Sequence, residues 1–160
     1  SAKNVREDGV DLTVVDHVSD DVAERCWQRC KPQAGDVLMV CVGNIGRLCL
    51  LKDPPPMVIV RSVALIRGEP SWVAPEYLAL VLRSKVCQKQ MTQFIKKTAQ
   101  PGLYINRIKQ IRIPVPPLAE QRRIVAKVDE LMSMCDALER RLGQAEATRR
   151  AALEAVLAQV

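Results

Sequence analysis

A cluster of prolines followed by a long stretch without proline most constrains the fold of this chain. Prolines occupy positions 114, 116 and 117, and residues 118–160 then contain no proline and only one glycine, Gly143. Proline cannot continue a helix or occupy a central strand, but Pro117 suits the first helical turn, where its missing N–H is no loss. The sequence therefore predicts a globular domain over residues 1–117 and one long helix over residues 118–160.

The predicted helix would be about 65 Å long at about 1.5 Å per residue, which is too long for a small domain to bury. Its apolar residues alternate spacings of four and three, the heptad pattern of a coiled coil. We expect this seam to pair with a second helix, either a different one or the same helix of a second copy. The alternative is an ordinary amphipathic helix folded back on its own domain. The seam comprises Ile124, Val128, Leu131, Cys135, Leu138, Leu142 and Ala145.

Charge is distributed unevenly along the chain. Residues 1–24 carry two Lys/Arg against seven Asp/Glu, residues 25–117 carry fifteen against four, and residues 118–160 carry seven of each. The surplus of eleven positive charges in the middle segment favours a polyanionic partner, most simply nucleic acid. The alternative is a basic surface that has no such partner.

Short apolar runs in the globular part predict a small, strongly bent β-sheet with packed helices. The whole chain is thus expected to be an α+β protein that ends in one long coiled-coil-forming α-helix. Ser19 can cap a short helix from Asp20 to about Gln28, and two further helices are expected between residues 75 and 97. The expected strands are Val37–Val42, Leu48–Leu51, Met57–Val60 and Val63–Ile66.

Several functional classes find no support in the sequence. The six cysteines form no CxxC pair and His17 is the only histidine, so no zinc pattern is present. No apolar run approaches the ~18 residues of a membrane span, and no secretory signal opens the sequence. We expect a cytoplasmic protein that needs no metal, no other cofactor and no membrane.

One glycine-containing loop is a candidate for contact with DNA. In Gly43-Asn44-Ile45-Gly46-Arg47, the two glycines allow positive φ and the close approach of a phosphate or a base edge, with Arg47 beside them. The same residues also suit a plain hairpin turn. Neither a phosphate-binding P-loop nor a nicotinamide-cofactor fingerprint is present, because the fuller glycine spacing of both motifs is missing.

A second loop, residues 98–107, mixes turn residues with side chains that can read bases. Glutamine and asparagine can pair with adenine, and arginine can pair with guanine. The alternative is a plain Pro-Gly turn. Together with basic residues elsewhere in the middle segment, the two loops give these candidate DNA-binding residues: Arg47, Lys52, Arg61, Arg67, Lys97, Gln100, Tyr104, Asn106 and Arg107.

Four segments of the chain resemble one protein family, the DNA specificity subunits of type I restriction-modification enzymes. The most specific is the proline-to-helix junction, Ile113–Val125, and the likeness extends over at least residues 19–142. The other three segments are Lys31–Leu38, Val42–Arg47 and Thr98–Asn106. The chain resembles the C-terminal part of one target-recognition domain together with the spacer helix that follows it.

The resemblance implies a division of labour. The recognition domain would read one half of a bipartite target in double-stranded DNA. The helix would pair with a second spacer helix and dock the modification (methyltransferase) subunits, which the restriction (motor-nuclease) subunit joins. The specificity subunit itself would be no enzyme and would have no catalytic residue. A full subunit has two recognition domains and two helices, so we expect a fragment or half of a subunit.

Two other hypotheses remain open. One is the DNA-recognition part of a fused restriction-methylation enzyme, although the chain has no Asn-Pro-Pro-Tyr methyltransferase signature and no carboxylate–lysine nuclease cluster. The other is a coiled-coil interaction module without DNA binding. Methylation or nuclease motifs in the rest of the coding sequence would favour the first, and a surface without a basic cleft would favour the second.

Overall fold

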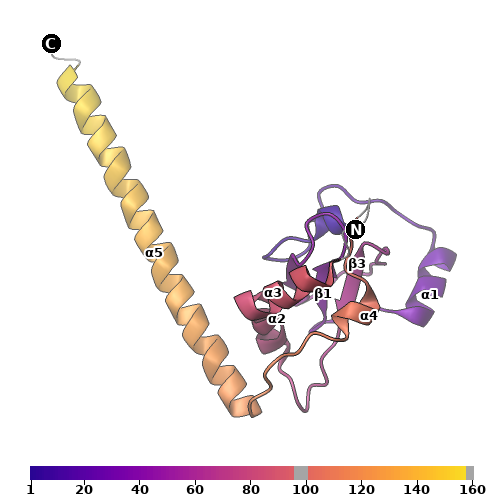
Figure 1. Cartoon of the computed structure of the whole chain (residues 1–160). Helices are drawn as coiled ribbons and strands as arrows, with labels where there is room; N and C mark the ends of the chain where they lie inside the picture. The colour runs from indigo at the N-terminus through magenta and orange to yellow at the C-terminus, as the bar shows by residue number, and fades with distance from the viewer. Residues whose placement is uncertain (96–100, 158–160) are drawn as a thin grey trace. The chain divides into compact units, whose positions relative to one another are not determined.

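The structure of this chain is a computed structural model that describes residues 1–95 and 101–157. The chain divides into two compact units, Ser1–Arg122 and Arg123–Val160 (Figure 1). The first unit contains the sheet, the shorter helices and the first turn of the long helix. The second unit contains the remainder of that helix. Among the described residues, no helix combines the length and the hydropathy that a membrane crossing requires.

A three-stranded antiparallel sheet lies at the centre of the first unit. The strand order is β2-β1-β3, and Leu38 in the central strand pairs with Cys49 on one side and Leu65 on the other. Every residue of β1 is at most 2% exposed. A strand covered on both faces needs no alternation of apolar and polar residues, which explains its continuous apolar run. The strands are β1 (Val37–Val40), β2 (Leu48–Leu50) and β3 (Val63–Ile66).

The prediction of a fourth strand at Met57–Val60 is wrong. These residues have no strand conformation and are not paired with any strand of the sheet. Met57 and Ile59 instead pack against the hydrophobic core. The Met57 carbonyl oxygen accepts a hydrogen bond of 2.8 Å from the indole Nε1 of Trp27. The apolar segment thus supplies core side chains, and a side chain of α1 binds one of its carbonyl groups.

The antiparallel sheet and the helices packed with it confirm the α+β class. α2 packs against β1 and β2 and also against α3, whereas Val5, Met57 and Ile59 from outside the sheet pack with Leu38 and Val40 of β1. Pro75 begins α2, and the Ser84 hydroxyl caps α3 by accepting from the Cys87 N–H at 3.4 Å. The helices are α1 (Asp20–Arg29), α2 (Pro75–Arg83), α3 (Lys85–Phe94), α4 (Ile105–Ile108) and the short 3-10 helix η1 (Ala2–Asn4).

The loop with two glycines forms the turn of the β1–β2 hairpin. Gly43 has φ +85° and Gly46 has φ +88°, so both adopt the positive values predicted for them. A Cβ atom on Gly46 would lie 2.5 Å from Oε1 of Gln88, and Gln88 Nε2 donates to the Gly46 carbonyl at 3.1 Å. The positive φ therefore favours glycine at position 46, and any larger residue there would also displace the Gln88 amide.

The long helix α5 (Leu118–Leu157) begins directly after Pro117, as predicted. Gln121, in its first turn, is fully buried. Its Oε1 accepts from the Ala74 N–H at 2.9 Å, and its Nε2 donates to the carbonyl oxygens of Trp72 and Pro116, each at 2.7 Å. All three partners are backbone groups, so one side-chain amide joins the loop before α2 to the proline segment.

Replacing Gln121 with alanine should lower the free energy of unfolding by about 2–3 kcal/mol, because it removes the partners of three backbone groups. Urea denaturation followed by tryptophan fluorescence measures this, since Trp27 and Trp72 both belong to the first unit. The exposed Gln144 of α5 provides the control, and Gln144→Ala should change stability by no more than about 0.5 kcal/mol. Equal stability of the two variants would contradict a structural role for the Gln121 amide.

Candidate nucleic-acid interface

A cleft of about 920 Å³ lies between α1, the segment that leads into β3 and the loop that leads into α4. Buried apolar residues such as Cys41, Val63 and Leu103 form part of its lining. None of the described residues that line it is acidic. Its polar lining residues are Arg25, Arg29, Arg61, Tyr104 and Asn106. We call this site the basic cleft, since it combines an apolar lining with positive charge.

Main-chain contacts hold one wall of the basic cleft. The Leu103 N–H donates to the Cys41 carbonyl at 2.9 Å, and Gly102 forms an isolated antiparallel bridge with Val42. The Leu103 side chain is buried, whereas Tyr104 is 56% exposed. The loop is therefore fixed to the end of β1, and the residues that follow it remain free to contact a ligand.

Helix α1 forms another wall of the basic cleft. Val22, Arg25, Cys26 and Arg29 recur at the i, i+3, i+4, i+7 spacing of one helix face, and all four line the cleft. Arg25 forms an ion pair with Asp21 on its own helix at 3.1 Å. The Arg29 side chain has no hydrogen bond or ion pair with any other residue that the structure describes. The two arginines were not predicted from the sequence, and the signal for them was this mixed apolar and basic face.

The sheet register separates the predicted DNA-binding residues. Arg61 lies at the end of β1 that carries the basic cleft, because the neighbouring Ser62 carbonyl accepts from the Cys41 N–H at 2.8 Å. Tyr104 and Asn106 line the same cleft. Lys52 follows β2 at the opposite end of the sheet and is exposed. The predicted residues Lys97 and Gln100 lie outside the described part of the chain.

Arg67 also lies at the opposite end of the sheet, where the fold uses its guanidinium group. Its Nε and Nη2 donate to the two carboxylate oxygens of Asp36 at 2.6 and 2.7 Å, and Nη2 donates to the Lys31 carbonyl at 3.0 Å. The Asp36 side chain is only 1% exposed, whereas that of Arg67 is 48% exposed. The hydrogen bonds with Asp36 raise the pKa of Arg67 above its usual value. Arg67 therefore stabilises the fold through its contacts with Asp36 and Lys31.

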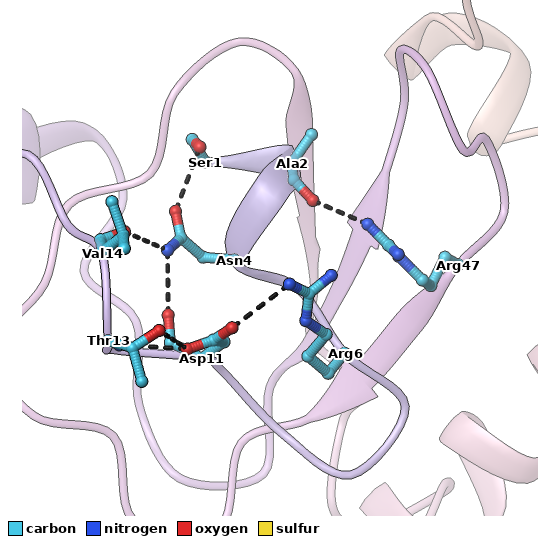
Figure 2. Close-up of polar contacts among 8 residues, drawn as sticks. All are labelled: Ser1, Ala2, Asn4, Arg6, Asp11, Thr13, Val14 and Arg47. Carbon is cyan, nitrogen blue, oxygen red and sulfur yellow. Dashed lines mark hydrogen bonds and ion pairs between the residues drawn. The ribbon is translucent and has the colours of Figure 1, made fainter.

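The Arg47 side chain is likewise turned toward the protein. Its Nη2 donates to the Ala2 carbonyl at 3.0 Å (Figure 2), while its Nε is buried without a partner among the described residues. Asn4 organises the same region, because its Nδ2 donates to the carbonyl oxygens of Asp11 and Val14 at 2.9 and 2.8 Å. Arg47 therefore connects the hairpin turn to the N-terminal segment.

Arg107 belongs to α4, next to the basic cleft. Its guanidinium carbon lies 6.0 Å from the centroid of the Phe94 ring, and its Nη1 donates to Gln110 Oε1 at 3.2 Å. Both contacts are at the surface, and Arg107 is exposed. The aromatic ring restricts the side chain without neutralising its charge.

Three cysteines, Cys26, Cys30 and Cys41, line the basic cleft. Burial raises the pKa of the Cys41 thiol, so this thiol remains protonated near neutral pH and is a poor nucleophile or metal ligand. Within residues 1–95 and 101–157, no group of three or more His, Cys, Asp and Glu side chains is arranged to hold a metal ion.

The predicted pairing seam of α5 is largely uncovered. Leu131, Leu138 and Leu142 are 48%, 55% and 64% exposed, and Cys135 and Ala145 are exposed as well. Ile124 and Val128, near the start of the seam, are half-buried. An apolar stripe of this length is unfavourable in water and is typical of a surface that binds another helix.

Comparison with known proteins identifies the family. Residues 13–146 match the model of the type I restriction modification DNA specificity domain. The chain belongs to this family. It is similar to the Escherichia coli type I restriction enzyme EcoBI specificity subunit, at 28% identity over 97% of this chain and 32% of the relative. It is also similar to the EcoKI specificity subunit of Escherichia coli strain K12, at 28% identity over 86% of this chain and 31% of the relative.

Solved structures of this family have a similar fold. The crystal structure of the HsdS subunit from Thermoanaerobacter tengcongensis matches 69% of this chain with a TM-score of 0.61 and 30% identity, over 29% of that subunit. A chain from a study of complex assembly and conformational transition of the type I R-M system matches 72% of this chain with a TM-score of 0.60 and 30% identity, over 30% of that chain. This chain thus spans about a third of the length of its relatives.

Substitutions of Arg67 and Arg61 should separate structural from ligand-binding arginines. Arg67→Ala should lower the free energy of unfolding by about 2–3 kcal/mol, since it leaves the Asp36 carboxylate buried without its cation, although the exposure of Arg67 moderates the loss. Arg61→Ala should cost no more than about 0.5 kcal/mol, because Arg61 is exposed and has no partner among the described residues. Urea denaturation measures both, and comparable losses would contradict this division.

Proposed function

We propose that this chain is the DNA-reading part of a type I restriction-modification specificity subunit and recognises one half of a bipartite target. The observation that carries the proposal is the basic cleft, where Arg61, Tyr104 and Asn106 lie together without an acidic neighbour in the lining. Positive charge attracts the phosphate backbone, while amide and aromatic side chains can contact bases. Family membership supports the same reading.

The proposed contacts fall into two kinds. Arg61, Lys52 and Lys97 would position the phosphate backbone, whereas Asn106, Gln100 and Arg107 would meet base edges and Tyr104 would meet a base face or a thymine methyl. Arg47 and Arg67 are weaker candidates, because their guanidinium groups already bind backbone or carboxylate groups of the fold. Only contacts with base edges should change which sequence is preferred.

The chain itself would perform no chemistry. We propose that it acts within a larger complex, in which methyltransferase subunits dock on α5 and a motor-nuclease subunit joins them. The basis is family membership and the exposed apolar seam of α5.

Binding to duplex DNA tests the reading function directly. The chain should bind a fluorescent mixed-sequence duplex with an affinity that falls steeply as salt rises, because phosphate contacts release counterions. Asn106→Ala should flatten the preference at one base pair by about 1–3 kcal/mol in selection from a randomised duplex pool. Arg61→Gln should weaken binding to all sequences alike. An affinity that does not change with salt would contradict the proposal.

We also propose that α5 pairs with a second helix through its seam. With one such helix per chain, two copies can supply the pair about a twofold axis, which is the commonest symmetry of oligomers. In the longer proteins of this family a second spacer helix would take the place of the second copy. Each buried leucine or valine contributes roughly 1.5–3 kcal/mol, so several in register exceed the entropy lost on association.

Charge placed in the seam should abolish this pairing. Leu131→Asp combined with Leu138→Asp should sediment as a monomer, whereas the unmodified chain should sediment as a dimer at micromolar concentration. The matched control is Ser133→Asp combined with Gln144→Asp, which adds the same charge outside the seam and should leave the dimer intact. A monomeric unmodified chain at high micromolar concentration would show that the seam has no partner in a second copy.

A further inference from the structure

Helix α1 also has a solvent-exposed face, yet two of its arginines lie on the face that lines the basic cleft. Arg25 and Arg29 share a helix face with Val22 and Cys26, and this face lines the cleft. The bond from Trp27 to the Met57 carbonyl holds α1 beside the segment that leads into Arg61. The fold therefore fixes the position of the two arginines beside the cleft.

The charges at this site are not balanced within the protein. Arg29 and Arg61 both line the basic cleft, and neither side chain forms a hydrogen bond or ion pair with another residue of the described ranges. Arg25 differs, because its guanidinium group already pairs with Asp21 at 3.1 Å. Like charges that face one cleft without a counter-charge are unfavourable until an anion binds between them. The cleft is thus complementary to a polyanion at two separate segments.

We propose that Arg29 contacts a phosphate of bound duplex DNA, so that α1 and the Arg61 segment hold the backbone from two sides of the cleft. This inference rests on the proposed DNA-reading function and adds α1 to the contact surface. Arg29 would bind the phosphate backbone and set where it lies, while Asn106 and Arg107 meet the bases. A phosphate contact carries no sequence information, so Arg29 should act on affinity alone.

Three variants of the full chain test the proposal with the same fluorescent mixed-sequence duplex. Arg29→Gln should weaken binding about tenfold for all sequences and make the slope of log affinity against log salt shallower by about one, as expected when one phosphate contact is lost. Arg29→Lys keeps the charge and should retain most of the affinity. Lys89→Gln removes an equal charge from the exposed face of α3, outside the cleft lining, and should leave the slope unchanged.

A structural role for Arg29 predicts a different result. A cation in the last turn of a helix also stabilises the helix dipole, so thermal unfolding is measured on every variant. The proposal would be overturned if the Arg29→Gln variant unfolds at a lower temperature but keeps the salt slope of the unmodified chain. Equal effects of Arg29→Gln and Lys89→Gln on the salt slope would overturn it as well. Failure of the unmodified chain to bind the duplex at low salt would instead overturn the DNA-reading function itself.

Discussion

Strand β1 is the constraint on which the rest of the first unit depends. Its four residues are buried on both faces, and both of its edges are hydrogen-bonded to other strands. Each end of β1 then holds a different part of the first unit in place. At the start, the buried Asp36 carboxylate pairs with the half-exposed Arg67 side chain; at the other end, the Cys41 carbonyl holds the loop that leads to Tyr104 and Asn106. The proposed DNA contacts thus depend on a strand that DNA would not touch.

The structure also changes how the positive charge of the middle segment should be read. The Arg67 guanidinium group donates to the Asp36 carboxylate, and that of Arg47 donates to the Ala2 carbonyl. The Arg83 guanidinium group donates to the carbonyl oxygens of Glu7 and Leu48. Arg29 and Arg61 have no such partners among the described residues. A charge count along a sequence therefore overestimates the charge that a ligand meets, because guanidinium groups serve equally well to satisfy the backbone of the protein itself.

Much of the fold was predictable because it depends on local chemistry. The prolines before Leu118 and the apolar run at β1 allow few conformations, and the structure confirms both predictions. The error at Met57–Val60 has a different origin: an apolar segment can fill a core without joining a sheet, and here Met57 and Ile59 pack against the core without strand conformation. Periodicity along a segment contains no information about its distant neighbours.

The candidate site was predictable only in part, for the same reason. Arg61, Tyr104 and Asn106 were recognised by residue type, and the fold brings them to one cleft. Arg29 was missed because a short helix with mixed charges looks like an ordinary surface helix until its neighbour is known. Gln121 was missed because nothing in its local sequence distinguishes a buried glutamine from an exposed one. Both depend on contacts between segments far apart in the chain.

The attachment of the loop before α4 has a consequence for how the protein can evolve. The loop is held to β1 through main-chain groups at Cys41, Val42 and Gly102, together with the buried side chain of Leu103. Backbone groups are the same whatever the sequence, so the exposed positions from Tyr104 to Arg107 can be exchanged with little effect on folding. Under the proposed DNA-reading function, related proteins could change these positions, and with them their DNA target, while the scaffold stays the same.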